Sequence, residues 1–99
     1  MAETSFNRLI HGENRLQICA ILALISEVEF KVLKEKLAVS DSVLSKHIKA
    51  LEDASYVNVA KRTDLGRKRT WLSLSREGRQ AYAAHIQALQ DIIGETHND

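Results

Sequence analysis

The sequence of 99 residues contains no proline, only four glycines and only five aromatic residues. Without proline-, glycine- or serine-rich stretches it offers no linker between domains, and it shows no internal repeat. We therefore expect residues 1–99 to form one domain, with a core over residues 13–75 and a C-terminal helix over residues 76–93. Because aromatic residues are few, leucine, isoleucine, valine and alanine must fill most of the core.

Cys19 is the single cysteine, so the chain cannot form an internal disulfide. It lies in the apolar run ICAILALI, which is far shorter than the roughly twenty residues needed to span a bilayer. The run predicts a buried helix, and the lack of an N-terminal signal peptide predicts a cytoplasmic location without a membrane. A redox role needs an exposed, electropositive cysteine, which the apolar neighbours of Cys19 disfavour.

Residues that would indicate a metal site or an enzyme are also scarce. The four histidines are far apart in the sequence, and no ligand cluster with zinc-like spacing occurs. There is no phosphate-binding loop and no nucleophile elbow, and the pair Glu52-Asp53 is typical of an acidic helix end. We therefore expect no metal, no cofactor and no enzymatic activity.

The net charge of +1 conceals an uneven distribution of charge along the chain. Residues 31–70 contain ten lysines and arginines against five acidic residues, whereas the rest of the chain contains four basic and eight acidic residues. This surplus of positive charge indicates one basic face, which either contacts a nucleic acid or is an ordinary solvated surface.

Apolar periodicity predicts three helices in the first forty residues. The lead-in Thr4–Ile10 is amphipathic and is expected to be helical, and residues 13–26 form a helix that is apolar almost all round. Such a helix needs to be covered on several faces, which its own domain or a second subunit can do. A short strand at Glu27–Glu29 and a helix over residues 30–37 follow.

A third helix is expected from its N-cap Ser40 to about Ala54. Its buried face consists of Leu44, Ile48 and Leu51, at helical spacing. The opposite, polar face consists of Ser42, Ser45, Lys46 and Lys49.

Alternation of apolar and polar residues predicts two strands, Tyr56–Arg62 and Arg69–Leu74. The six residues Thr63–Lys68 form the turn between them, where Gly66 suits a positive φ. Ser75 then caps the last helix. The order helix, helix, helix, hairpin, helix is that of a winged helix-turn-helix domain, mainly α with a small β-hairpin (α+β), with N- and C-terminal helices available for dimerisation.

Three stretches of the segment Phe30–Gly78 and its next residue match a family pattern: LKEKLAVSDSVLSKHIKALEDASYV (33–57), GRKRTWLSL (66–74) and LSREGR (74–79). This segment resembles the winged-helix regulators of the MarR and ArsR type, above all the short single-domain MarR-like proteins. It departs from them at Ser55, where the family usually has glycine. Glycine suits a left-handed helix end, and serine there costs about 1 kcal/mol.

The resemblance implies a sequence-specific DNA-binding transcriptional regulator, a repressor rather than an activator because there is no extra domain. The helix over residues 40–54 would lie in the major groove, and the wing over residues 61–70 would contact the backbone or the minor groove. The expected DNA contacts are Ser40, Ser42, Ser45, Lys46, Lys49, Arg62, Arg67, Lys68 and Arg69. His47 borders the buried stripe, which favours packing over a DNA contact. Trp71 either packs on a helix or fills an interface.

Regulators of this type bind palindromic operators in double-stranded DNA as homodimers, so we expect a dimer surface outside the basic segment. Its candidate residues are Phe6, Leu9, Ile10, Tyr82, Ile86, Leu89 and Ile93. Alternatively, the last helix packs only on its own domain. The resemblance allows a small organic effector at the interface, although no residue identifies one. The competing hypothesis is a winged-helix docking module for another protein, which the basic third helix and wing disfavour.

Overall fold

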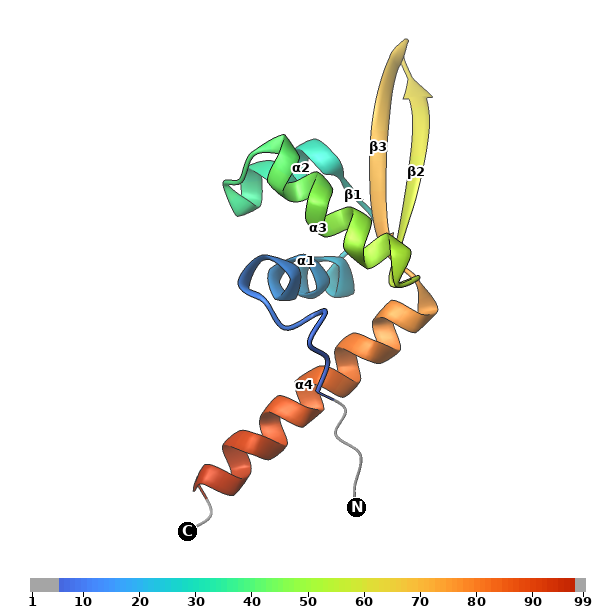
Figure 1. The fold of residues 1–99 in the computed structure, drawn as a ribbon. Helices are drawn as coiled ribbons and strands as arrows, with labels where there is room; N and C mark the ends of the chain where they lie inside the picture. The colour runs from blue at the N-terminus through green and yellow to red at the C-terminus, as the bar shows by residue number, and fades with distance from the viewer. Residues whose placement is uncertain (1–5, 98–99) are drawn as a thin grey trace.

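The computed structural model describes residues 6–97. Within them, four helices and three strands follow one another as α1 (Glu13–Leu24), β1 (Val28–Glu29), α2 (Phe30–Leu37), α3 (Asp41–Asp53), β2 (Val57–Asp64), β3 (Arg67–Leu74) and α4 (Arg76–His97). Helices α1, α2 and α3 form one group, the β2–β3 hairpin projects from it at one end, and α4 extends away at the other (Figure 1). The predicted winged helix-turn-helix fold of the α+β class is confirmed.

The ends of α3 are those that the sequence predicts. Oγ of Ser40 accepts a hydrogen bond from the backbone N–H of Val43 at 3.2 Å, which satisfies a donor that the first helical turn leaves unpaired. After the helix, Ser55 has a φ of 65°, and its N–H donates to the carbonyl oxygen of Glu52 at 2.9 Å. This is the left-handed conformation that glycine would adopt at lower cost.

The sheet has the order β1-β3-β2, with β3 in the centre and both pairings antiparallel. Strand β1 contributes a short pairing, in which Val28 lies opposite Leu72. Strand β2 pairs along its whole length, and Val57 lies opposite Leu74. The short β1 therefore joins the base of the wing to the helices.

The turn of the wing is shorter than predicted. Asp64 and Arg67 still pair, so that only Leu65 and Gly66 connect the strands, with φ of 52° and 78°. Two central residues with positive φ make a tight turn whose twist matches that of the strands. The predicted six-residue turn over 63–68 is therefore wrong, because this ribbon lies in solvent on both faces and its pairing needs no apolar alternation.

The predicted helix at Thr4–Ile10 is also wrong over the residues that the structure describes, which form a turn. Oδ1 of Asn7 accepts a hydrogen bond from the N–H of Ile10 at 3.0 Å. Such a side-chain acceptor competes with the backbone carbonyls that would form a helix. Thr4 itself lies outside the described residues.

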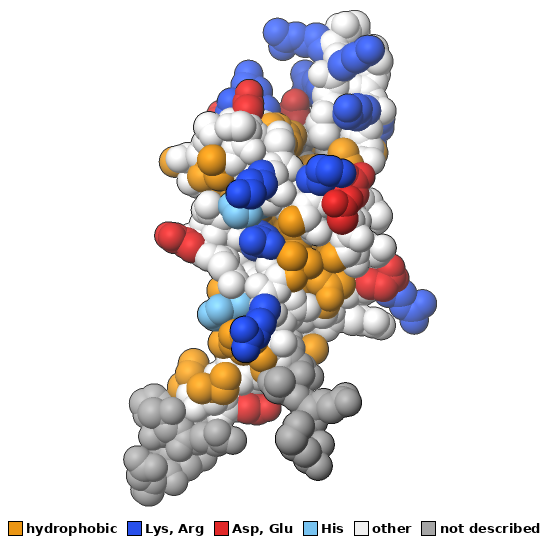
Figure 2. Space-filling view, in the orientation of Figure 1, with side chains coloured by type: hydrophobic (Ala, Val, Ile, Leu, Met, Phe, Trp, Pro, Cys, Tyr) orange, Lys and Arg blue, Asp and Glu red, His pale blue; other side chains and the backbone are white. Residues whose placement is uncertain are grey.

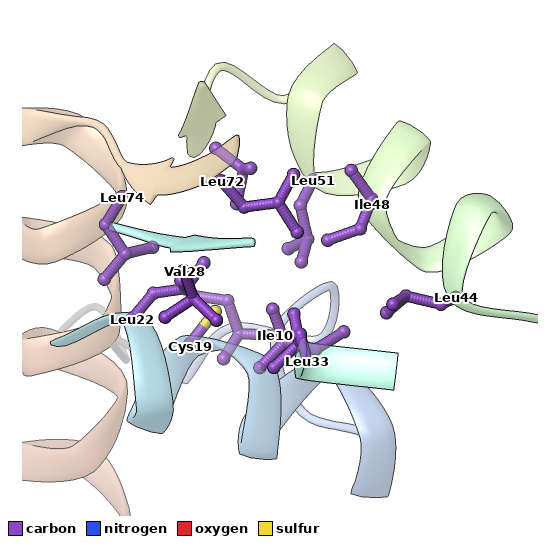
Figure 3. Packing of buried hydrophobic residues seen from close by; sticks show 12 residues of the cluster. Ile10, Cys19, Leu22, Val28, Leu33, Leu44, Ile48, Leu51, Leu72 and Leu74 are labelled. Carbon is purple, nitrogen blue, oxygen red and sulfur yellow. The ribbon is translucent and has the colours of Figure 1, made fainter. Parts of the chain in front are cut away.

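The core lies between the helices and the inner face of the sheet (Figure 3). Its buried members are Ile10, Ile18, Cys19, Leu22, Val28, Leu33, Leu44, Ile48, Leu51, Val57, Leu72 and Leu74. Burial raises the pKa of the Cys19 thiol to about 11, so the reactive thiolate is disfavoured. Ile10 is completely buried. Its expected place on a dimer surface is therefore wrong, since its side chain fills the core of its own protomer.

A hydrogen-bonded junction attaches α4 to the start of the wing. The N–H of Ser75 donates to the carbonyl oxygen of Tyr56, and Oγ of Ser75 accepts from the N–H of Gly78, both at 2.9 Å. A Cβ on Gly78 would overlap the same Tyr56 carbonyl oxygen. The helix then runs to His97, four residues beyond its predicted end at residue 93.

Candidate nucleic-acid interface

The polar face of α3 is open to solvent. Ser42, Ser45, Lys46 and Lys49 are all exposed, as the sequence predicts. The ammonium group of Lys49 lies 3.5 Å from Asp53 one turn later, but such a solvent-exposed pair is weak and leaves the lysine available. Ser40 is exposed as well, but its hydroxyl group is occupied by the helix cap and lies 3.2 Å from Oγ of Ser42.

An open groove of about 500 Å³ separates α3 from the wing. Ser45, Lys49 and Glu52 line its α3 side, and Lys61 and Thr70 line the side of the wing. The floor of the groove is apolar and consists of Phe30, Ile48, Val59 and Leu72. Two lysines from consecutive elements, Lys49 of α3 and Lys61 of β2, thus flank one groove.

Lys61 was not among the residues predicted to contact DNA. It follows Val57 and Val59 at every second position of β2, so it lies on the face of the ribbon that points toward α3. The predicted strand Tyr56–Arg62 already contains all three residues, so this alternation was a signal that the sequence offered for Lys61. Lys68 shares the face, since its partner across the hairpin is Thr63, two residues after Lys61.

The opposite face of the ribbon contains two arginines that bind acidic residues of the protein itself. Arg62 Nη2 lies 2.6 Å from Glu27 Oε1. Arg69 lies 3.6 Å from Glu29 and 3.9 Å from Asp64. Both arginines were predicted to contact DNA, and the structure places both in ion pairs with carboxylates.

Trp71 lies on this second face, opposite in direction to Leu72 and Leu74. Its ring is half-buried, with Cζ of Arg62 4.8 Å from the ring centroid. With Ile25 and Val32, it lines a small hollow beside β1. Trp71 therefore contacts Arg62 of its own wing, and part of its ring faces this hollow.

A second, more basic hollow lies where the wing meets the start of α2. It has a volume of about 300 Å³ and is lined by Lys31, Arg67, Lys68, Arg69 and the single carboxylate of Glu29. Lys31 was not among the predicted contacts either, because nothing in the sequence places it next to the wing. Lysine and arginine side chains are seen along the wing and over α3 in Figure 2.

His47 is half-buried at the edge of α3, and its Nε2 lies 3.5 Å from Nδ2 of Asn14 in α1. Burial, with smaller contributions from Arg15 and Lys46, lowers the pKa of His47 below its ordinary value. The ring therefore packs between α3 and α1 as a neutral group at pH 7.

The N-terminal segment is attached to α4 through a second, completely buried histidine, His85. The N–H of Asn7 donates to Nδ1 of His85 at 2.9 Å, and Nε2 of His85 lies 3.1 Å from Nδ1 of His11. The ring of Phe6 lies against both imidazoles, at centroid distances of 4.6 and 4.8 Å. Burial, and then His11, lowers the pKa of His85.

The residues expected at a dimer surface differ in exposure. Ile93 is 55% exposed, and its neighbour Ile92 is 49% exposed. Leu9 and Tyr82 pack partly against the core, whereas Ile86 and Leu89 are half-buried on α4. Of the residues expected at a dimer surface, Ile93 near the end of α4 is therefore the most exposed, although Leu24 of α1 and Leu65 of the wing turn are 88% and 92% exposed.

The residues that the structure describes also lack two other features. Residues 6–97 contain no helix with the length and apolar character needed to cross a membrane. Over the same range, no three histidine, cysteine, aspartate or glutamate side chains are grouped closely enough to hold a metal ion.

Comparison with known proteins agrees with this geometry. Residues 14–93 match the family pattern of the winged helix DNA-binding domain. An uncharacterized protein of Methanocaldococcus jannaschii is 36% identical over 79 residues, which cover 80% of this chain and 86% of that protein.

Solved structures show the same fold. A transcriptional regulator homologue of Pyrococcus horikoshii OT3 has a TM-score of 0.86 at 21% identity, over 92% of this chain and 90% of that one. NadR in complex with 4-hydroxyphenylacetate has a TM-score of 0.73 at 21% identity, over 93% and 64% of the two chains. AbfR bound to DNA has a TM-score of 0.67 at 17% identity, over 81% and 58%. These structures have the same winged-helix fold, and the chain belongs to the winged helix DNA-binding domain family.

Proposed function

We propose that this protein is a sequence-specific transcriptional repressor that binds a palindromic operator as a homodimer. The groove between α3 and the wing is the observation that carries the proposal. Lys49 and Lys61 are both exposed and flank it from opposite sides. A duplex whose major groove receives α3 would place phosphates near both lysines at once.

Within this arrangement, the residues of α3 and of the wing have different tasks. Ser42, Ser45 and Lys46 lie on the first turns of α3, where side chains of a recognition helix meet base edges. Contacts from Lys49, Lys61, Lys68 and Arg67 would go to phosphates or the minor groove, and would set affinity and register rather than sequence preference. Ser40 contributes by capping α3, which orients the first turn.

A homodimer explains how so small a domain could bind an operator tightly. Two copies related by a two-fold axis would contact half-sites about 34 Å apart, which is one turn of B-DNA. The apolar end of α4, with Ile92 and Ile93, is the surface that we assign to the second copy. Repression needs no further domain, since a dimer bound at a promoter excludes other proteins.

Relatives of the same fold support the proposal in two respects. The structure of AbfR contains DNA, and that of NadR contains 4-hydroxyphenylacetate. By analogy, we propose that a small organic effector binds near the dimer interface and changes the affinity for DNA.

Selection of fragmented genomic DNA on the purified protein, at about physiological salt, followed by sequencing, tests the proposal. A short palindromic motif is the expected result. The motif should change with Ser45→Ala and stay the same with Ser26→Ala, an exposed serine between α1 and β1. Retention without a motif would indicate a non-specific DNA-binding protein. No retention, even at low salt, would favour a docking module for another protein.

A further inference from the structure

The wing is joined to the helices by few backbone contacts. Strand β1 pairs with β3 at two positions, Val28 with Leu72 and Glu29 with Trp71. Farther out, from Lys61 and Thr70 to the turn, the pairing described for the ribbon is between its own two strands. A two-stranded ribbon of this kind is marginally stable by itself and twists freely. Side chains at its base are therefore needed to hold its direction.

We infer that Glu27 and Glu29 are wing-positioning residues, which hold Arg62, Arg69 and Trp71 and thereby set the affinity for DNA. These five residues are called the wing clamp below. The inference rests on the proposed function, because it concerns how the wing reaches DNA. It also gives Arg62 and Arg69 a different role from the direct DNA contact expected from the sequence.

The contacts of Arg62 support the inference. Its guanidinium binds the Glu27 carboxylate at 2.6 Å on one side and lies 4.8 Å from the Trp71 ring centroid on the other. An exposed ion pair alone contributes little, but a short charge-assisted hydrogen bond combined with a cation–π contact fixes one conformation of a long side chain. Arg62 is thereby turned toward β1, away from the groove beside α3.

The second ion pair lies directly beside the first. Arg62 and Arg69 are opposite each other across the hairpin, and Glu29 is opposite Trp71 across the β1–β3 pairing. Arg69 lies 3.6 Å from Glu29, and its side chain is 31% exposed against 19% for the glutamate. The clamp thus contacts both strands of the wing from the one segment that precedes α2.

Neutralising Glu27 distinguishes a clamp residue from an ordinary surface acid, because the two roles predict changes of opposite sign in the affinity for DNA. Removal of a negative charge near a DNA-binding surface normally strengthens binding, because DNA is a polyanion. If Glu27 holds the wing, Glu27→Gln should instead weaken binding by about three- to tenfold, the size of effect expected for loss of one partly exposed ion pair with its cation–π contact. The salt dependence should stay unchanged, since no phosphate contact is lost.

The experiment measures affinity for the selected operator at several salt concentrations for the wild type, Glu27→Gln and Glu35→Gln. Glu35 is an exposed acid on α2, so its variant makes the same charge change outside the clamp. Fluorescence of Trp71, the single tryptophan of the chain, reports the clamp without DNA. We expect Glu27→Gln to shift the emission and Glu35→Gln to leave it unchanged.

A charge exchange completes the test. Arg62→Glu alone should weaken binding, and Arg62→Glu combined with Glu27→Arg should recover most of the loss, because the pair is restored in reverse. No recovery, or tighter binding with a steeper salt dependence in Glu27→Gln, would overturn the inference and return Arg62 to the DNA contacts. Unchanged Trp71 emission in Glu27→Gln would overturn it as well. Failure of the wild type to bind any DNA would instead refute the proposed function, and the two failures are therefore distinguishable.

Discussion

Gly78 shows how a single residue fixes the direction of α4. A methyl group at this position would overlap the carbonyl oxygen of Tyr56, whereas Gly94 in the same helix has no atom within 4 Å of the corresponding point. We expect Gly78→Ala to lower the free energy of unfolding by about 1–3 kcal/mol, as for other overpacked sites. Gly94→Ala should raise it by up to about 1 kcal/mol. Equal effects of the two variants in urea unfolding would contradict the packing described.

The buried His85 predicts a pH-dependent stability. Its folded-state pKa lies below the ordinary value of 6.5, so between these two values the unfolded chain binds more protons than the folded protein. The free energy of unfolding should therefore be constant above about pH 7 and decrease as the pH falls through and below 6.5. His47 contributes in the same direction.

The variant His85→Asn tests the assignment. Asparagine keeps an acceptor near the position of Nδ1 for the N–H of Asn7 but does not titrate. Chemical unfolding at several values between about pH 5 and pH 8 should show a smaller decrease at low pH for the variant than for the wild type, even if the variant is less stable overall. A decrease of the same size in both proteins would exclude His85 as its source.

At the scale of elements, the direction of each strand residue determines which wing charges face DNA. Lys61 and Lys68 lie on the side of α3, so Lys61→Gln and Lys68→Gln should each weaken binding to all sequences. Each should also reduce the slope of log affinity against log salt by about 0.9, the value for one lost phosphate contact. The control is Lys36→Gln on α2, since Lys36 is exposed beside the hollow at Trp71. A slope unchanged by Lys61→Gln would remove this residue from the interface.

The elements themselves were predictable to different degrees. Helix α3 follows the prediction closely, because its cap at Ser40 and its apolar stripe are local features. The lead-in was mispredicted because one side-chain acceptor, Asn7, outweighs an amphipathic pattern that is only a few residues long. The wing strands were predicted too short, since charged residues rarely indicate a strand unless their partner strand is known.

At the scale of the whole molecule, the apolar end of α4 leads to a prediction about assembly. Ile92 and Ile93 are 49% and 55% exposed, and burial of the remaining exposed part of each side chain in a second copy would stabilise a dimer by roughly 0.8–1.5 kcal/mol each. Ile92→Glu combined with Ile93→Glu should give monomers in sedimentation equilibrium and weaken binding to a palindrome. Leu24→Glu, at an 88% exposed leucine on α1, is the matched control and should leave the mass unchanged. A dimer that survives the double change would place the interface elsewhere.

The sequence by itself determined the fold class, the bounds of α2 and α3, and the polar face of α3, because helical periodicity and capping depend on residues only a few positions apart. It also predicted the left-handed backbone conformation of Ser55, because the family that the sequence resembles usually has glycine at this position. The tertiary structure decided which basic residues share a surface. Lys49 and Lys61 meet across one groove, whereas Arg62 and Arg69 bind Glu27 and Glu29. The sequence does not show toward which surface a charged side chain points, because strand register and packing determine that direction.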